Sequence, residues 1–320
     1  MSFAILRLLQ TITTRCDFVG SNLVTNFVVD RVARIPKLDS PMGSYLVEFD
    51  LEHNVQRMAC FGLYEVEVRR LLQAIVTPDA IFFDVGANVG FYSLLAAQLV
   101  GMRGQVHAFE PIAENVATLR AAIASNRITQ ITVQHVAVGQ YAGTMRLFIG
   151  TPETSPEWQR DLQSWASQVP SKRRPLPIYV PQISLDDYVH HHQLDRVDFI
   201  KLDIEGSEID ALRGAQHLLW RADAPDLICE ISPYLLAQQN LDPRHLTKYL
   251  ATFGYTLFHI LPDRQRVIHR MLHTHQPIRL QYVDPMQSFP FEGNLFCTKQ
   301  PELLRERARM AIAFIGKKFA

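Results

Sequence analysis

The sequence predicts an α/β fold built on a mostly parallel sheet with helices on both faces. Short apolar runs such as 81–85 (IFFDV) and 105–110 (QVHAFE) are typical of buried parallel strands. Segments with the apolar spacing of a helix, such as 91–100, lie between these runs. Strands that alternate with helices form βαβ units, in which successive strands run in the same direction.

The alternation continues along most of the chain. Further strands are predicted at 131–138, 197–203, 226–231, 255–260 and 294–299. Further helices are predicted at 62–75, 114–126, 184–192, 207–220 and 245–254. We therefore expect one large domain over 71–300, an N-terminal extension of mixed helix and strand over 1–70, and an amphipathic C-terminal helix over 301–320.

Residues 150–181 interrupt this pattern. The segment contains six prolines and two of the three tryptophans, Trp158 and Trp165. Because proline disfavours helix interiors and central strands, we expect an insertion or long loop with a helical piece near 157–168. Loops of this length in a compact domain are often lids or substrate-binding elements.

The composition is that of an ordinary globular protein. Hydrophobic residues make up 48% of the chain, and 32 basic residues balance 32 acidic residues. Nucleic-acid-binding domains usually carry a basic excess, so we expect no nucleic-acid partner. The four cysteines form no CxxC pair, and no run approaches the ~20 apolar residues that cross a bilayer. We therefore expect no transmembrane segment and a cytoplasmic location.

The turn after strand 81–85 is the first candidate site. It reads DVGANVG over 84–90, at the strand-to-helix turn where Rossmann-like folds bind nucleotides. Gly86 permits a tight turn, and Gly90 permits close packing of the helix. The GxGxxG pattern of dinucleotide sites is missing. Asp84 would repel a pyrophosphate, whereas it would attract the ammonium and sulfonium groups of S-adenosylmethionine.

Glu110 ends the second predicted strand, at the position where dinucleotide-binding folds use a carboxylate to bind ribose hydroxyls. We expect this strand-end side chain to be partly exposed. His135, near the end of the third strand, would either border the adenine or be a core histidine. The predicted cofactor-binding residues are Asp84, Gly86, Ala87, Asn88, Gly90, Glu110, Pro111, His135 and Ala137.

Five segments of the sequence resemble the FkbM family of methyltransferases. They are 82–94 (FFDVGANVGFYSL), 107–111 (HAFEP), 135–139 (HVAVG), 184–189 (SLDDYV) and 199–215 (FIKLDIEGSEIDALRGA). The resemblance covers about 60–300, from GLYE (62–65) to NLFCTK (294–299). It implies a Rossmann-like class I methyltransferase fold with a seven-stranded sheet whose last strand runs antiparallel. It also implies S-adenosylmethionine as methyl donor and a hydroxyl as acceptor.

The motifs do not define the acceptor. Acceptors in the resembled family include sugars, lipid-linked glycans and polyketides, and we expect the acceptor to be selected by 1–60 and 150–181, outside the matched motifs. The predicted function is O-methylation of a hydroxyl on a sugar, a glycan or another secondary metabolite. The alternatives are a nicotinamide-dependent oxidoreductase, which the missing GxGxxG pattern disfavours, and a non-catalytic protein that retains the fold.

Acidic residues follow the fourth and fifth predicted strands. Asp203 ends the fourth strand, Glu205 lies in the next loop, and Glu230 ends the fifth strand. Methyl transfer to an alcohol requires a positioned acceptor and a route for its proton, so Asp203 or Glu205 is a candidate general base. In the alternative interpretation, Asp203 binds loop amides and Glu205 caps the next helix. Lys201, within the fourth strand, is a candidate buried partner of a carboxylate.

A metal-assisted route is a further alternative for these carboxylates. Asp203 and Glu230 could hold a Mg²⁺ ion that polarises the acceptor hydroxyl. The family resemblance does not require a metal. We therefore predict S-adenosylmethionine as the cofactor and no metal site.

Overall fold

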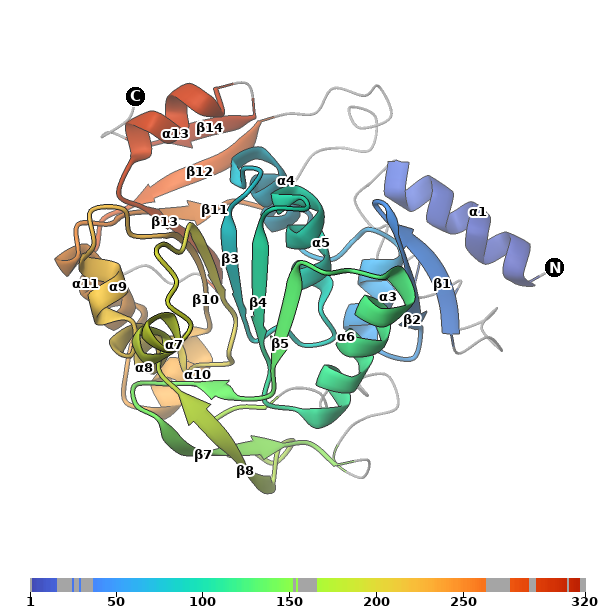
Figure 1. Cartoon of the computed structure of the whole chain (residues 1–320), viewed down its shortest axis with the longest axis horizontal. Coiled ribbons are helices and arrows are strands. Elements are labelled where there is room, and N and C mark those ends of the chain that lie inside the picture. Colours follow the sequence, from blue (N-terminus) through green and yellow to red (C-terminus); the bar gives the residue numbers. More distant parts are fainter. Residues whose placement is uncertain are drawn as a thin grey trace.

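The computed structural model describes residues 2–15, 25, 29, 37–151, 154, 166–262, 277–287, 292–309 and 311–316 of the chain. Its centre is a large sheet that crosses the molecule (Figure 1). In the described residues, its strands are β3 (Ile81–Val85), β4 (Gln105–Phe109), β5 (Ile131–Gln134), β9 (Phe199–Leu202), β10 (Asp226–Ile231), β11 (Thr256–Ile260), β12 (Ile278–Val283), β13 (Gly293–Thr298) and β14 (Ile312–Ile315). Their order is β14-β12-β11-β13-β10-β9-β3-β4-β5.

The predicted α/β fold class is confirmed. Strands β5, β4, β3, β9 and β10 are parallel neighbours, and β13 is antiparallel to both β10 and β11. These strands with β11 form the predicted seven-stranded arrangement with an antiparallel last strand. Within the described part of the chain, β12 and β14 lengthen the sheet beyond β11, so the prediction is two strands short at that edge.

Helices cover both faces of the sheet. They are α4 (Val66–Ile75), α5 (Phe91–Val100), α6 (Ala113–Asn126), α7 (Leu185–His191), α8 (Glu208–Arg213), α9 (Gln216–Trp220), α10 (Pro233–Gln238) and α11 (Pro243–Thr252). Side chains from α4, α5 and α6 lie in one buried cluster with Phe82. Side chains from α7 to α11 lie in a second buried cluster with Phe83. Successive side chains of a strand point to opposite faces, so the two clusters fill the two sides of the sheet.

Two predicted elements are broken in the structure. The predicted helix 207–220 is divided into α8 and α9, because Asp186 takes the hydrogen bonds at the break: its amide donates to the Gly214 carbonyl at 2.8 Å, and its carboxylate accepts from the amides of His217 and Leu218 at 2.8 and 3.0 Å. The predicted strand 131–138 is divided into β5 and β6 (Ala137–Val138). Strand β6 belongs to a separate three-stranded sheet, in the order β6-β8-β7, with β7 (Gly143–Ile149) and β8 (Leu176–Ile183).

The ends of the insertion are more regular than predicted. Residues 176–181 belong to β8, which pairs antiparallel with β7 over residues 176–182. The predicted helical piece near 157–168, with Trp158 and Trp165, lies almost entirely outside the described residues.

The prediction of one helix over 301–320 is wrong. Helix α13 covers only Pro301–Arg307, and the chain then forms β14. The reason is tertiary: Ile312 and its successors pair in parallel with β12, starting opposite Ile278. Sheet pairing therefore overrides the helical spacing of this short segment.

The N-terminal residues pack on the main body. They form α1 (Ser2–Arg15), a hairpin of β1 (Lys37–Met42) and β2 (Tyr45–Asp50), and α3 (Asn54–Cys60). The amide of Asn126 at the end of α6 exchanges two hydrogen bonds of 2.8 Å with the backbone of Leu46. Phe49 and Phe61 lie in the same buried cluster as Phe82.

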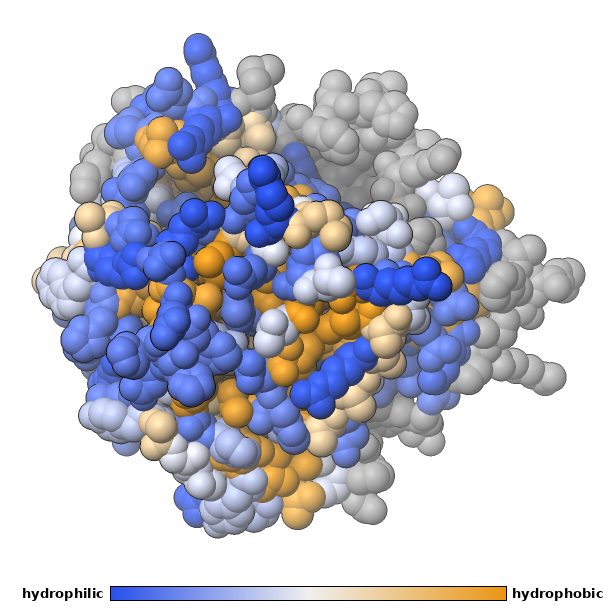
Figure 2. Space-filling model, in the orientation of Figure 1, coloured by the Kyte–Doolittle hydropathy of each residue, from blue (hydrophilic) through white to orange (hydrophobic). Residues whose placement is uncertain are grey.

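Hydrophilic residues cover much of the face shown in Figure 2, and apolar residues gather toward its centre. None of the helices in the described ranges has the length and apolar character needed to cross a membrane.

Candidate active site

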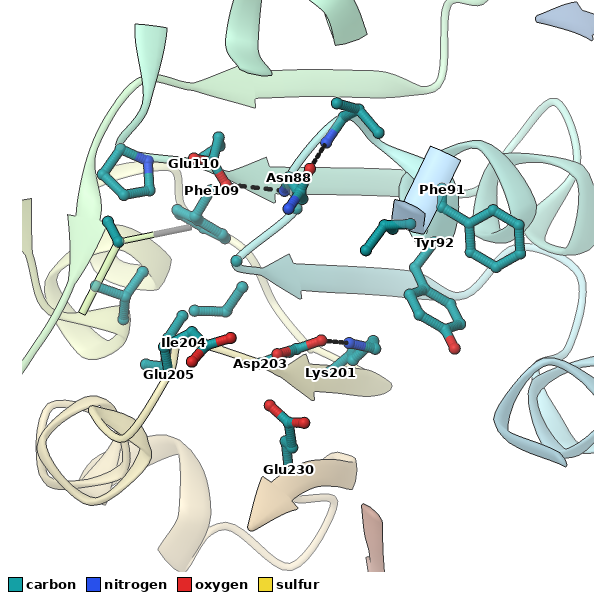
Figure 3. Close-up of a pocket in the computed structure, with 18 of the residues that line it drawn as sticks. Asn88, Phe91, Tyr92, Phe109, Glu110, Lys201, Asp203, Ile204, Glu205 and Glu230 are labelled. Carbon is teal, nitrogen blue, oxygen red and sulfur yellow. Dashed lines mark hydrogen bonds and ion pairs between the residues drawn. The ribbon is translucent and has the colours of Figure 1, made fainter. Parts of the chain in front are cut away.

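A cavity of about 290 Å³ opens at the carboxyl ends of β3, β4, β9 and β10 (Figure 3). This edge of a parallel sheet is where open α/β folds bind their ligands. The glycine turn and Glu110 form one part of its wall, and Asp203, Glu205 and Glu230 form another. Sequence analysis predicted both groups, and the structure brings them into one cavity.

The glycine turn is shaped by the close approach of two strand ends. Gly86 has a φ of +83°, and a Cβ there would lie 1.9 Å from the carbonyl oxygen of Asp203. The amides of Gly86 and Ala87 both donate to the carbonyl of Phe109 at 3.0 Å. A Cβ at Gly90 would lie 2.2 Å from Leu119 of α6, so this glycine permits helix packing, as predicted.

Glu110 is held by three donors. The amides of Asn88 and Ile112 donate to its two oxygens at 2.8 and 2.9 Å, and the side chain of Asn115 donates at 3.1 Å. The residue is only 4% exposed, so the expected partial exposure is wrong: the following turn folds back over the carboxyl group. Burial raises the pKa of Glu110 to about 7, although the three donors oppose this shift.

Three of the predicted cofactor residues do not line the cavity. Asp84 is 1% exposed and accepts a 2.6 Å hydrogen bond from the Ser93 hydroxyl, behind the turn. Gly90 lies at the start of α5. His135 is exposed, with Nε2 3.1 Å from the carbonyl of Pro111, so it is not a core histidine. The six that do line it are Gly86, Ala87, Asn88, Glu110, Pro111 and Ala137.

Asp203 forms an ion pair with Lys201. The sequence had suggested Lys201 as the partner of a carboxylate, and Asp203 is that carboxylate. Lys201 Nζ lies 2.7 Å from Asp203 Oδ2. Burial favours a raised pKa for Asp203, but the Lys201 charge and the hydrogen bonds of Glu230 and Lys201 together lower the pKa. The charge of Asp203, together with burial, raises the pKa of Glu230 well above its ordinary range. Of the two carboxyl groups, Asp203 therefore carries the negative charge more readily and Glu230 the proton.

In the alternative interpretation, Asp203 would bind the loop amides and Glu205 would cap the next helix, but the structure gives these groups other partners. The loop amides of Ile204 and Gly206 donate to Glu208, at 3.1 and 3.2 Å. Glu205 Oε2 lies 3.2 Å from Nη1 of Arg174, which comes from the C-terminal part of the insertion. The insertion thus contacts the loop that carries two of the predicted catalytic carboxylates.

Comparison with known families places these motifs in a single domain. The model described as "Methyltransferase FkbM domain" matches residues 84–257, more than half of the chain. The chain belongs to the FkbM methyltransferase family. The 31-O-demethyl-FK506 methyltransferase FkbM of Streptomyces tacrolimicus is 27% identical over 183 residues, which cover 50% of this chain and 66% of that relative.

Solved structures similar to this FkbM family member include several methyltransferases. A putative rRNA methylase from Clostridium thermocellum is 9% identical, with a TM-score of 0.40, and the match covers 72% of this chain and 92% of that one. An S-adenosylmethionine-dependent O-methyltransferase from Thermotoga maritima is 12% identical, with a TM-score of 0.35, over 73% of this chain and 64% of that one.

Sequence reasoning missed a polar group at the N-terminal side of the cavity of the FkbM chain. Glu65, which precedes the matched domain, accepts hydrogen bonds of 2.6 Å from the Tyr92 hydroxyl and the Asn294 side chain. Glu65, Tyr64 and Tyr92 all line the cavity. The GLYE segment at 62–65 is the signal that marks this group, but nothing in the sequence indicates its contacts with Tyr92 and Asn294.

Among the residues that the structure describes, no three His, Cys, Asp or Glu side chains are grouped to hold a metal ion. Beside Asp203, the positive charge is supplied by the Lys201 ammonium.

Proposed function

We propose that this FkbM methyltransferase transfers the methyl group of S-adenosylmethionine to a hydroxyl group of a small molecule or glycan. The observation that carries the proposal is a single cavity with Glu110 and the glycine turn in one wall and the Asp203–Glu230 pair in another. Glu110 and the glycine turn are suited to binding the nucleoside of the cofactor. The Asp203–Glu230 pair is suited to accepting a hydrogen bond from the acceptor hydroxyl.

The residues around the glycine turn fit the cofactor. Two carboxylate oxygens offer about four acceptor positions, and Glu110 uses three for its protein donors, which leaves capacity for a ribose hydroxyl. Pro111 and Ala137 would border the adenine, and the backbone of 86–88 would border the methionine part. When bound, the cofactor supplies a methyl group activated by the sulfonium. Asp84 would act on its cations only from behind the turn.

Asp203 is the better candidate for receiving the acceptor proton. Burial raises the pKa of Glu205, and the Asp203 charge together with burial raises that of Glu230, whereas the pKa of Asp203 is lowered and its side chain is 21% exposed. A low pKa normally weakens a general base. Here the hydroxyl proton becomes strongly acidic as the C–O bond forms, so a weakly basic carboxylate at the right place is sufficient.

The N-terminal segment and the insertion are the proposed acceptor-selecting elements. Asn54, Val55 and Met58 of α3 line the cavity, as does Ala166 of the insertion. All but Ala166 precede the matched family domain. The name of the Streptomyces tacrolimicus relative specifies an O-demethyl acceptor, which supports oxygen as the methylated atom.

A radiometric assay tests this function. Purified protein is incubated with S-adenosylmethionine that carries a labelled methyl group and with a panel of neutral sugars, glycolipids and hydroxylated polyketides. We expect alkali-stable label in at least one hydroxylated acceptor, and loss of that label with Asp203→Asn. Transfer of label to nitrogen or carbon would contradict O-methylation, and failure to bind the cofactor would contradict methyl transfer altogether.

A further inference from the structure

Lys201 is a buried cation in the wall of the cavity. It lies in β9, opposite Asp84 of β3 and Ile228 of β10 in the sheet register. Its side chain is 1% exposed, and Nζ lies 4.4 Å from the centre of the Tyr92 ring and 2.7 Å from Asp203 Oδ2. Burial of an ammonium is costly unless charges and hydrogen bonds compensate it. The carboxylate and the aromatic face provide that compensation.

Asp203 is held from two neighbouring strands. Residues 201 and 203 lie on the same side of the extended chain, so the lysine reaches Oδ2, and the Asp203 carboxyl group also shares a side-chain hydrogen bond with Glu230. Figure 3 shows the Lys201–Asp203 pair with Glu230 directed toward Asp203 from the neighbouring strand. Asp203 and Glu230 both line the cavity, so a bound acceptor could reach them.

The charges make the arrangement asymmetric. Two ionised carboxylates this close would repel each other, and the lysine stabilises the charge on Asp203 and thereby the proton on Glu230. Burial alone would lower the pKa of Lys201, but the surrounding carboxylates raise it. The other titratable groups that interact with these three residues are Tyr64, Glu65, Asp84, Tyr92, Glu205 and Glu208.

We propose that Lys201 is a positioning residue for methyl transfer, which holds Asp203 through Oδ2 and keeps its carboxylate charged and in place for the acceptor hydroxyl. The inference rests on the proposed function, because it assumes a hydroxyl acceptor. The new C–O bond would form as the methyl–sulfur bond of the cofactor breaks, with that electron pair left on the sulfur of the departing S-adenosylhomocysteine. The O–H electron pair remains on the acceptor oxygen, and the proton passes to Asp203 and later to solvent. Lys201 itself neither donates nor receives a proton.

Carbon NMR of labelled aspartate and glutamate carboxyl groups tests the proposal without an acceptor. Asp203→Asn and Glu230→Gln identify the two signals. In the wild type, Asp203 should titrate below an ordinary aspartate, and Glu230 should be protonated at pH 7. In Lys201→Met, Asp203 should titrate about 1–3 pH units higher, the effect of losing an adjacent opposite charge. Lys299→Met is the matched control, because Lys299 lies over Tyr255 instead.

Two results would overturn the inference: an unchanged Asp203 titration in Lys201→Met, or an ionised Glu230 at pH 7 in the wild type. The second measurement decides the matter even if Lys201→Met does not fold. With an identified acceptor, the pH profile of kcat should move upward in Lys201→Met and be retained in Lys201→Arg, whereas a purely structural role would lower kcat at every pH. Calorimetry with S-adenosylmethionine distinguishes a wrong role for Lys201 from a wrong function. Cofactor binding would be retained in the first case and missing in the second.

Discussion

Glu110 should make cofactor binding depend on pH. In the ligand-free protein, burial raises the pKa of this carboxyl to about 7. A ribose hydroxyl donates a hydrogen bond that favours the ionised form, so cofactor binding should lower the pKa and release a proton. Roughly one tenth of the groups is ionised at pH 6, and roughly nine tenths at pH 8. The affinity should therefore rise about ninefold between these two pH values.

Isothermal titration with S-adenosylhomocysteine at pH 6, 7 and 8 measures this effect. Buffers with different ionisation enthalpies report the released proton independently. Glu110→Gln should bind more weakly, by about 1–3 kcal/mol for the lost charged hydrogen bonds, and its affinity should be flat over the same range. Glu114→Gln is the matched control, since Glu114 is an exposed carboxylate in the first turn of α6.

The reasoning would be refuted if Glu110→Gln retained the wild-type pH dependence, because the titrating group would then lie elsewhere. Equal affinity of the wild type at pH 6 and 8 would show that the cofactor does not discriminate between the two forms of Glu110. Unchanged affinity in Glu110→Gln at pH 8 would remove Glu110 from the binding site.

Three further outcomes follow from the site. Gly86→Ala should abolish cofactor binding, because its Cβ would meet the Asp203 carbonyl at 1.9 Å. Gly101→Ala is the control, since Gly101 also has a positive φ but no atom within 4 Å of the added Cβ. It should lower the free energy of unfolding in urea by only about 1–2 kcal/mol. Asp203→Asn should retain the cofactor affinity and lower turnover at least ~100-fold, and full activity in both this variant and Glu205→Gln would show that neither takes the proton. Because an ammonium already neutralises Asp203, EDTA should leave turnover unchanged, and loss of activity restored by Mg²⁺ would contradict this.

The centre of the fold could be predicted because its signals are local. The apolar run 81–85 and the glycine turn after it fix the first strand and helix, and both are present as predicted. The break at Gly214 could not be recognised, since it depends on hydrogen bonds with Asp186, which lies 28 or more positions away in the chain. The final strand Ile312–Ile315 depends in the same way on its pairing with β12.

The site shows the same division. Strand-end carboxylates meet at one edge of a parallel sheet, so the sequence could group Asp203 with Glu230. It could not show that Asp84 turns to the Ser93 hydroxyl, or that three donors enclose Glu110. The contact between Glu65 and Asn294 spans 229 positions of the chain, and no periodicity or motif encodes such a pair.

The most direct test of the central claim is calorimetric titration of the purified chain with S-adenosylmethionine and, separately, with NAD. The cavity has carboxylates and no GxGxxG turn, so the account predicts saturable binding of S-adenosylmethionine at one site and no binding of NAD. Gly86→Ala should remove the binding of S-adenosylmethionine. Binding of NAD without binding of S-adenosylmethionine would contradict the account and favour an oxidoreductase.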